Sequence, residues 1–261
     1  LLQRLVIDRL HIVGDIFDRG PGADKVMDTI MNYHTVDIQW GNHDIMWMGA
    51  AAGNEVCMCS VLRANIAYNN FDALEDGYGL NLRALSSFAQ DVYGDDPCTR
   101  FIPKVIEENE YDMVDIHLAA KMHKAIAILM FKLEMKLYDR NPEFHMDDRK
   151  TLYKTDFHRM VYTDNGKEYP LLDTHFPTID PDDPAKLTQG EEELLHVLRS
   201  SFTHSEPLHR HVAFLYTHGS SYLVANNNLL FHGCIPMTED GEFDTLNIHG
   251  EPLGGKALMD Y

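Results

Sequence analysis

The sequence predicts an α/β protein in which a parallel sheet is interrupted by a large, mostly helical insert. Two short apolar runs, 10–13 and 36–40, flank a stretch whose apolar residues recur at helical spacing. Each run ends in a glycine-containing polar loop, and helical periodicity dominates the long middle of the chain. The length of 261 residues fits one large domain or a core with an inserted lobe.

The charge balance limits the partners of this chain. It carries 22 Lys+Arg against 41 Asp+Glu, a formal net charge of −19, which repels nucleic acid and anionic membranes. No apolar run approaches the roughly 20 residues of a membrane span. The 4 cysteines form no paired framework, which favours a reducing compartment. We therefore expect a cytoplasmic protein with a small-molecule partner and no nucleic acid or membrane partner. An acidic chain can nevertheless bind phosphate through metal ions.

The first part of the chain, 1–48, predicts a βαβ unit. A strand over 10–13 is followed by a helix over 23–33 and a second strand over 36–40. A parallel crossover of this kind brings the carboxyl ends of both strands to one edge of the sheet. Open parallel sheets bind their ligands at that edge. The first loop (residues 14–20) and the second loop (residues 41–44) are therefore expected to share a site.

The rest of the chain predicts an insert over 49–216 and a return to the sheet over 217–261. The segment 141–184 is rich in Asp, Pro, Thr and His, which suggests a hairpin around 164–166 but too little apolar material for a core. Turn-prone residues at 226–228 separate two strands, 222–225 and 229–232. The helices expected in the insert cover 57–71, 80–93, 111–138, 191–201 and 209–216.

The polar residues at the strand ends predict a divalent-metal hydrolase site. In the first loop Asp15 and Asp18 lie three positions apart; an isolated Asp at a strand end is more often a helix cap or a surface group. The second loop adds the carbonyl oxygen of Asn42, the imidazole of His43 and a carboxylate that could bridge ions, Asp44. These ligand types occur together in metal-dependent hydrolases.

A third element completes the pattern, because His232 ends an apolar strand and a glycine follows it. The order GDxxDRG, GNHD and strand-terminal HG resembles the calcineurin-like metallophosphatases. Four longer segments resemble the class III fructose-1,6-bisphosphatases, the manganese-dependent bacterial enzymes of the Firmicutes type: LHIVGDIFDRGPGADKVM (10–27), QWGNHDIMW (39–47), EDGYGLNL (75–82) and YLVANNNLLFHGCIPM (222–237).

This resemblance covers the whole chain, including the helical insert that ordinary metallophosphatases lack. It implies a metallophosphatase core that carries the insert. It also implies hydrolysis of the 1-phosphate of fructose 1,6-bisphosphate, a reaction of gluconeogenesis that releases fructose 6-phosphate and phosphate. The substrate would be a small sugar bisphosphate and the cofactor a pair of Mn²⁺ ions.

The resemblance also implies a role for each matching residue. Asp15 resembles the carboxylate that bridges the two metals, and Asn42 and His232 resemble ligands of the second metal. The catalytic residues implied are His43, which protonates the leaving oxygen, Asp18, which orients His43, and Arg19, which holds phosphate. A guanidinium suits the last role because its planar fork matches the geometry of phosphate oxygens.

The chain departs from the family pattern at both ends. The family's first motif, Asp-x-His, and its last motif, a strand ending in Gly-His, have no counterpart among these 261 residues. We therefore expect an incomplete core, a piece of a longer enzyme that is inactive by itself because the remaining ligands hold a metal poorly. Two alternatives are a metallophosphatase for another sugar phosphate or a phosphoprotein, and a catalytically incomplete interaction or regulatory module.

A bisphosphate substrate requires a second cationic anchor. Arg63 and Arg83 are candidates, because both follow the second loop in the predicted helical insert. The simpler interpretation of each is an ordinary surface arginine. The sequence predicts neither an oligomeric state nor an effector.

Overall fold

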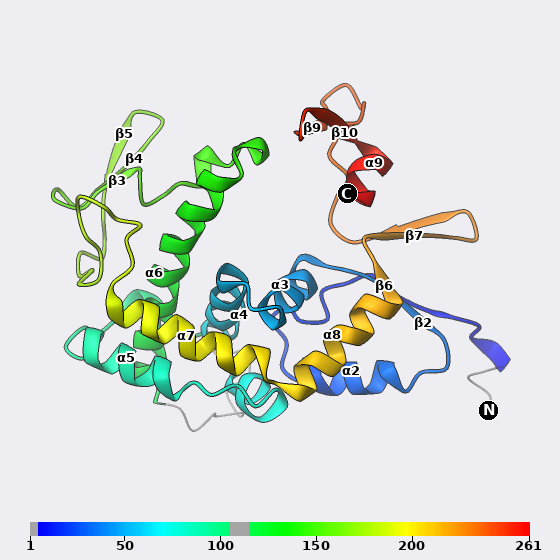
Figure 1. The fold of residues 1–261 in the computed structure, drawn as a ribbon, viewed down its shortest axis with the longest axis horizontal. Helices are drawn as coiled ribbons and strands as arrows, with labels where there is room; N and C mark the ends of the chain where they lie inside the picture. The colour runs from blue at the N-terminus through cyan, green and yellow to red at the C-terminus, as the bar shows by residue number, and fades with distance from the viewer. Residues whose placement is uncertain (1–4, 105–114) are drawn as a thin grey trace.

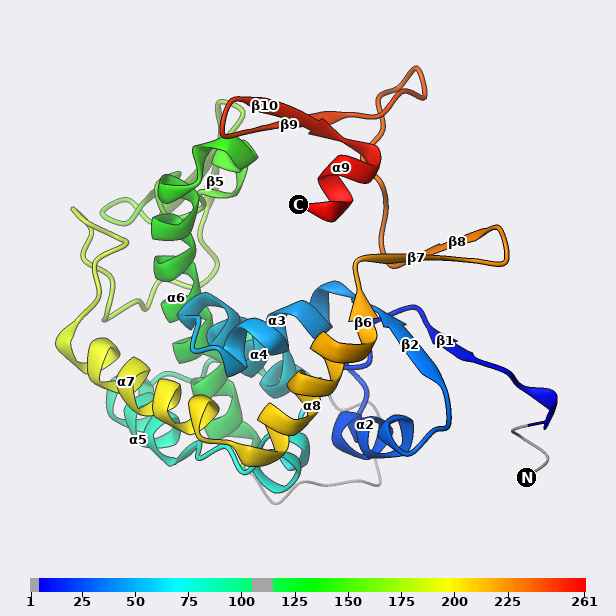
Figure 2. The ribbon, with the colours of Figure 1, turned by 45° about the vertical axis from the view of Figure 1, so that its right-hand side comes forward.

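A short parallel sheet carries both polar loops. In the computed structural model, which describes residues 5–104 and 115–261, strands β1 (Leu10–Ile12), β2 (Val36–Gln39) and β6 (Gly219–Ser220) lie in the order β1-β2-β6 (Figures 1 and 2). β1 and β2 are parallel, and helix α2 (Ala23–Met31) connects them, so the predicted βαβ unit is confirmed. β6 joins β2 in parallel as well. The carboxyl ends of all three strands therefore lie at the same edge of the sheet.

The two-residue strand β6, which no sequence pattern predicts, depends on contacts with β2. It follows helix α8 (Glu206–His218), whose Leu215 carbonyl oxygen accepts a hydrogen bond of 2.9 Å from the Trp40 indole N–H. A Cβ atom at Gly219 would collide with that indole nitrogen. Glycine at 219 therefore lets the end of α8 approach the end of β2 closely enough for β6 to pair.

Helices build most of the chain between β2 and β6, and the mixed α/β class is confirmed (Figure 1). Besides α8, the α-helices there are α3 (Asn42–Ala51), α4 (Glu55–Ala67), α5 (Arg83–Tyr93), α6 (Ile116–Arg140) and α7 (Gln189–Thr203). Shorter turns are the π-helix η1 (Ala73–Gly77) and the 3-10 helices η2 (Thr99–Phe101), η3 (Pro142–Phe144) and η4 (Asp147–Arg149). The start expected at 111 for the long helix lies outside the described residues. Side chains of the sheet and of α2 to α8 share one apolar core.

The prediction that residues 141–184 contribute to no core is wrong. Leu152, Phe157 and Ile179 pack with Ile128 and Met135 of α6 in a second, smaller core. The expected hairpin is confirmed as β4 (Val161–Asp164) and β5 (Lys167–Pro170), with β3 (Thr155–Asp156) beside β4. The segment can form a core because α6 is apolar on more than one side, so few apolar partners are needed.

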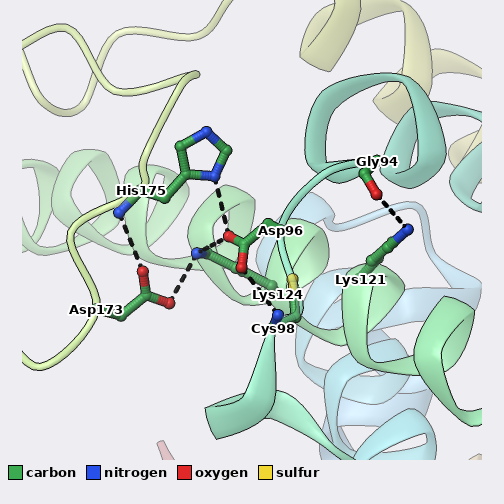
Figure 3. Close-up of polar contacts among 7 residues, drawn as sticks. All are labelled: Gly94, Asp96, Cys98, Lys121, Lys124, Asp173 and His175. Atoms are coloured by element: carbon green, nitrogen blue, oxygen red, sulfur yellow. Dashed lines mark hydrogen bonds and ion pairs between the residues drawn. The ribbon is translucent and has the colours of Figure 1, made fainter.

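A buried lysine of α6 ties two loops to this helix. The Lys124 side chain is 0 % exposed, and its Nζ lies 2.6 Å from Asp96 Oδ2 and 2.7 Å from Asp173 Oδ2. His175 Nδ1 contacts the same Asp96 oxygen at 3.0 Å (Figure 3). The ring of Tyr93 lies near the ammonium as well. The cluster joins the loop after α5 to the loop after β5.

A second buried lysine, eight positions further along α6, has the same function. Lys132 Nζ lies 2.8 Å from Glu191 Oε2 and donates a hydrogen bond of 2.6 Å to the Thr178 carbonyl oxygen. Glu191 also accepts a hydrogen bond from the Thr188 N–H at the start of α7. Both buried lysines therefore hold α6 against segments that are remote in sequence.

The last part of the chain extends from the sheet as two hairpins. Strands β7 (Tyr222–Ala225) and β8 (Asn228–Phe231) form the first, as predicted, and it projects beyond β6 (Figure 2). Strands β9 (Thr245–Ile248) and β10 (Glu251–Gly254) form the second, followed by α9 (Gly255–Asp260). Among the helices of the described residues, none is long and apolar enough to cross a membrane. All four cysteines are free thiols.

Candidate metal centre

Two glycines allow the first and second loops to approach each other. Gly14 has φ +82°, and a Cβ there would lie 2.5 Å from Gly41 N and 2.6 Å from Gln39 O. A Cβ at Gly41 would in turn collide with the Asp15 carboxylate. Asp15 itself has φ 55°, a left-handed conformation that costs energy for a residue with a side chain. The backbone therefore holds the Asp15 carboxylate against the second loop.

Asp44 organises both loops and is not free to bind a metal. The side chain is 0 % exposed and accepts hydrogen bonds from the N–H groups of Asp15 (2.9 Å), Gly41 (2.9 Å) and Phe17 (3.3 Å). Burial raises the pKa of Asp44, and these three N–H groups oppose that shift. The sequence suggests a bridging carboxylate at Asp44, and the structure shows an acceptor for backbone N–H groups of both loops instead. The available signal was its position three residues after Gly41 at a helix start, where a carboxylate reaches back to the N–H before the helix.

The structure brings Asp15, His43 and His232 together across 217 positions of sequence. Asp15 Oδ1 accepts a hydrogen bond of 3.1 Å from the His43 backbone N–H. The other carboxylate oxygen, Oδ2, lies 3.1 Å from His232 Nε2. His232 follows β8, so the first hairpin beyond the sheet delivers this imidazole to the strand ends. The expected convergence of these side chains is therefore observed.

The orientation of His232 fits a metal ligand. Its Nδ1 lies 2.7 Å from the Val13 carbonyl oxygen, which can only accept, so Nδ1 carries the proton. Nε2 faces Asp15 Oδ2: in the imidazolium it donates to that carboxylate, and in the neutral ring its lone pair is available, with the carboxylate, to a cation. Two ligand atoms bonded at about 2.1 Å to one ion at a right angle lie about 3 Å apart. The observed pair of atoms matches that spacing.

Asp18 and His43 form the other half of the site. His43 Nε2 lies 2.9 Å from Asp18 Oδ1, and the Arg19 Nε lies 3.4 Å from the same oxygen. Asp15, Asp18 and His43 each offer one ligand atom, and these atoms lie within 4.8 Å of one another. The group of two carboxylates and one imidazole can hold a metal ion.

Arg19 is exposed and its position is fixed by neighbours. Its guanidinium carbon lies 5.4 Å from the centre of the Tyr68 ring, and its carbonyl oxygen accepts a hydrogen bond from Asn70 Nδ2. Asn42 is exposed too and begins α3, directly before His43. Both side chains can therefore reach a ligand that arrives from solvent.

The two arginines considered for a second phosphate lie on other elements. Arg63 is on α4, and its Nε is buried. Its positive charge acts to lower the pKa of both His123 and Glu134 on α6. Arg83 is exposed at the start of α5. Within residues 5–104 and 115–261, neither forms an ion pair with Asp15 or Asp18.

Comparison with known proteins shows which family the chain resembles. The family model described as Firmicute fructose-1,6-bisphosphatase matches residues 1–261. Proteins named fructose-1,6-bisphosphatase class 3 are 54 % identical over 261 residues in Bacteroides fragilis and 53 % over 260 residues in Clostridium novyi. A protein of the same name from Listeria innocua is 51 % identical over 260 residues. No solved structure matches the chain.

The alignments cover this chain completely but not its relatives. They span 100 % of this chain and 39 % of the Bacteroides fragilis and Clostridium novyi proteins, and 40 % of the Listeria innocua protein. The match to the family model nevertheless extends over every residue. The chain belongs to the Firmicute fructose-1,6-bisphosphatase family.

Proposed function

We propose that the full-length protein is a metal-dependent phosphatase that hydrolyses fructose 1,6-bisphosphate to fructose 6-phosphate and phosphate in gluconeogenesis. The observation that carries this proposal is the pair of Asp15 Oδ2 and His232 Nε2 at 3.1 Å, with Nδ1 of the imidazole bound to a carbonyl. The carboxylate oxygen and the second imidazole nitrogen together offer two ligand atoms to one cation. Family membership supplies the substrate, since the relatives are named for fructose 1,6-bisphosphate.

We assign the metal ligands to Asp15, Asn42 and His232, and the metal to Mn²⁺ in a two-metal site. When bound, the ions activate water and neutralise charge on the phosphoryl oxygens. The strained backbone of the first loop holds the Asp15 carboxylate in place for this role. Asp18 is a second carboxylate within reach of the same cation, as its distance to the other ligand atoms allows.

His43 is the proposed general acid. Its Nε2 contacts Asp18, so that carboxylate orients the ring and favours the form that carries a proton on Nε2. Arg19 lies beside Asp18 with an exposed guanidinium, which can bind the transferred phosphoryl group bidentately. In the imidazolium form of His43 the proton on Nδ1, which is not directed at Asp18, is the one that the leaving oxygen of the sugar receives, while Nε2–H stays bonded to Asp18. Arg63 and Arg83 are the proposed anchors for the second phosphate.

The same proposal extends to the architecture and location of the protein. Residues 1–48 and 217–261 form part of a calcineurin-like metallophosphatase core, and residues 49–216 form its mostly helical insert. The parallel sheet of β1, β2 and β6, which unites the first and last of these parts, supports this division. The protein works in the cytoplasm on a small sugar bisphosphate, without nucleic acid or membrane.

The test is a comparison of initial rates in the purified full-length protein. With Mn²⁺, we expect hydrolysis of fructose 1,6-bisphosphate to exceed that of p-nitrophenyl phosphate by at least tenfold in kcat/KM. Addition of a chelator should abolish both activities, and Mn²⁺ should restore them. Equal rates on the two substrates would indicate a general metallophosphatase, and activity that survives chelation would contradict the metal assignment.

A further inference from the structure

The segment EDGYGLNL at 75–82 resembles the family but has no part in the proposed chemistry. In the structure it begins within the π-helix η1 and turns at Gly79, which has φ +65°. Tyr78 lies at the turn and its side chain is 0 % exposed. A fully buried tyrosine needs both apolar neighbours and a partner for its hydroxyl.

The Tyr78 ring packs behind both loops of the candidate metal centre. Its centre lies 4.9 Å from that of Trp47 and 6.1 Å from that of Phe17, and these two rings lie 5.1 Å apart. Phe17 belongs to the first loop, between Asp15 and Asp18. Trp47 is on α3, one turn after His43. One ring therefore supports the elements that carry the carboxylates and the imidazole.

Tyr78 is itself fixed by polar contacts on its other side. The hydroxyl lies 3.1 Å from His211 Nδ1, and His211 Nε2 lies 3.1 Å from the Asp28 carboxylate. Since the carboxylate can only accept, Nε2 carries the proton and Nδ1 accepts from the tyrosine. Burial raises the pKa of Tyr78, which keeps this donor protonated. The Tyr78 carbonyl oxygen also accepts a hydrogen bond of 2.5 Å from Ser205 Oγ.

We propose that Tyr78 is a positioning residue for the metal centre. His211 of α8, which also contacts Asp28 of α2, holds the hydroxyl. Ser205, directly before α8, holds the carbonyl oxygen. The ring packs against Phe17 and Trp47 and so restricts where these two side chains can lie. The spacing of the Asp15 and Asp18 carboxylates and of His43 then depends on a residue that touches no ligand atom. This inference rests on the proposed function, because it assigns the positioned groups to a metal site.

The test compares Tyr78 with Tyr93, a second fully buried tyrosine. Tyr93 lies on α5 with its ring near Lys124, so it matches Tyr78 in size and burial beside a different cluster, although its hydroxyl has no hydrogen-bond partner among the described residues. In the full-length protein we would make Tyr78→Leu, Tyr93→Leu, Tyr78→Phe and Tyr93→Phe. For each we would measure Tm, the Kd of Mn²⁺ from the electron paramagnetic resonance of the free ion, and kcat and KM.

We expect both leucine variants to lower Tm, since each loses a buried ring. Tyr78→Leu should also raise the Kd of Mn²⁺ about tenfold and lower kcat with KM unchanged, whereas Tyr93→Leu should leave Kd within twofold. Tyr78→Phe removes one buried hydrogen bond and should raise Kd about threefold. Tyr93→Phe should leave it unchanged.

If a leucine variant fails to fold, the comparison of Tyr78→Phe with Tyr93→Phe still tests the positioning role. Equal Kd values for the Tyr78 and Tyr93 variants would overturn the positioning role while the proposed function stands. Absence of Mn²⁺ binding in the unmodified protein would overturn both proposals. Retained Mn²⁺ binding without hydrolysis of fructose 1,6-bisphosphate would overturn only the proposed substrate, because the Kd comparison does not use it.

Discussion

The molecule contains clusters of carboxylates in two regions that balance their charge differently. On α6, Lys124 lies between Asp96 and Asp173, and Lys132 pairs with Glu191. At the candidate metal centre Asp15 and Asp18 meet imidazoles, and in the described part of the chain the ion pairs of these two carboxylates include no lysine. The first region pairs its carboxylates with buried ammonium groups, whereas the second pairs them with two imidazoles and one exposed guanidinium.

The pKa values show the same difference. Burial by itself raises the pKa of Asp96, but hydrogen bonds from Lys124, the Cys98 N–H and His175 lower it well below its usual range. Burial raises the pKa of Asp44, and the backbone N–H groups around it do not reverse the shift. Lys124 is therefore a fixed counter-charge for Asp96, whereas backbone N–H groups alone oppose the effect of burial on Asp44.

The largest effects should arise at the metal centre. His43→Asn in the full-length protein should lower kcat by about 10² to 10⁴ and leave Mn²⁺ bound, because it removes a proton donor rather than a ligand. Asp15→Asn should instead weaken Mn²⁺ binding at least tenfold, measured by calorimetric titration. If both variants lost the metal equally, His43 would have to be reassigned as a ligand.

Breaking a buried pair on α6 should affect stability without affecting the metal. Lys132→Met leaves the Glu191 carboxylate buried and unpaired, so we expect a loss of about 3–5 kcal/mol in urea unfolding. The Kd of Mn²⁺ should remain within twofold. The double variant Lys132→Met with Glu191→Gln should recover much of the loss, since it removes the orphan charge but keeps an acceptor for the Thr188 N–H. A Kd of Mn²⁺ raised more than twofold in Lys132→Met would show that the two regions are energetically coupled.

Acid should weaken the Lys124 cluster. The folded-state pKa of Asp96 is lower than the unfolded value of about 3.9, so ionised Asp96 adds stability above that pH. The contribution is lost as pH falls below the unfolded value toward the folded one. Between pH 5 and 3 we expect the free energy of unfolding to fall by about 1 kcal/mol more in the unmodified protein than in Asp96→Asn. Urea unfolding at each pH measures it. Parallel curves for the two proteins would contradict this expectation.

The smallest effect is expected at Arg83. Its side chain is exposed, so Arg83→Ala should change stability by no more than about 0.5 kcal/mol. As an anchor for the second phosphate it should raise KM for fructose 1,6-bisphosphate up to about fivefold with kcat unchanged, the size of one exposed ion pair. An unchanged KM would remove Arg83 from the substrate site.

Local patterns in the sequence determined the elements that depend on nearby residues. The βαβ unit, the long helices and the hairpins at 161–170 and 222–231 follow from apolar periodicity and turn residues. The first and second loops were identified as one site because parallel strands bring their carboxyl ends to one edge. His232 was included because it ends an apolar strand.

Tertiary structure alone decided which remote groups meet. Lys132 and Glu191 are 59 positions apart, and Lys124 and Asp173 are 49 apart, so no local pattern links them. The same holds for Tyr78 behind Phe17, and for β6, where two residues pair with β2 because Gly219 leaves room for Trp40. Periodicity reports which face of an element is buried, but the partner on that face is chosen by close packing and by the need to pair every buried charge.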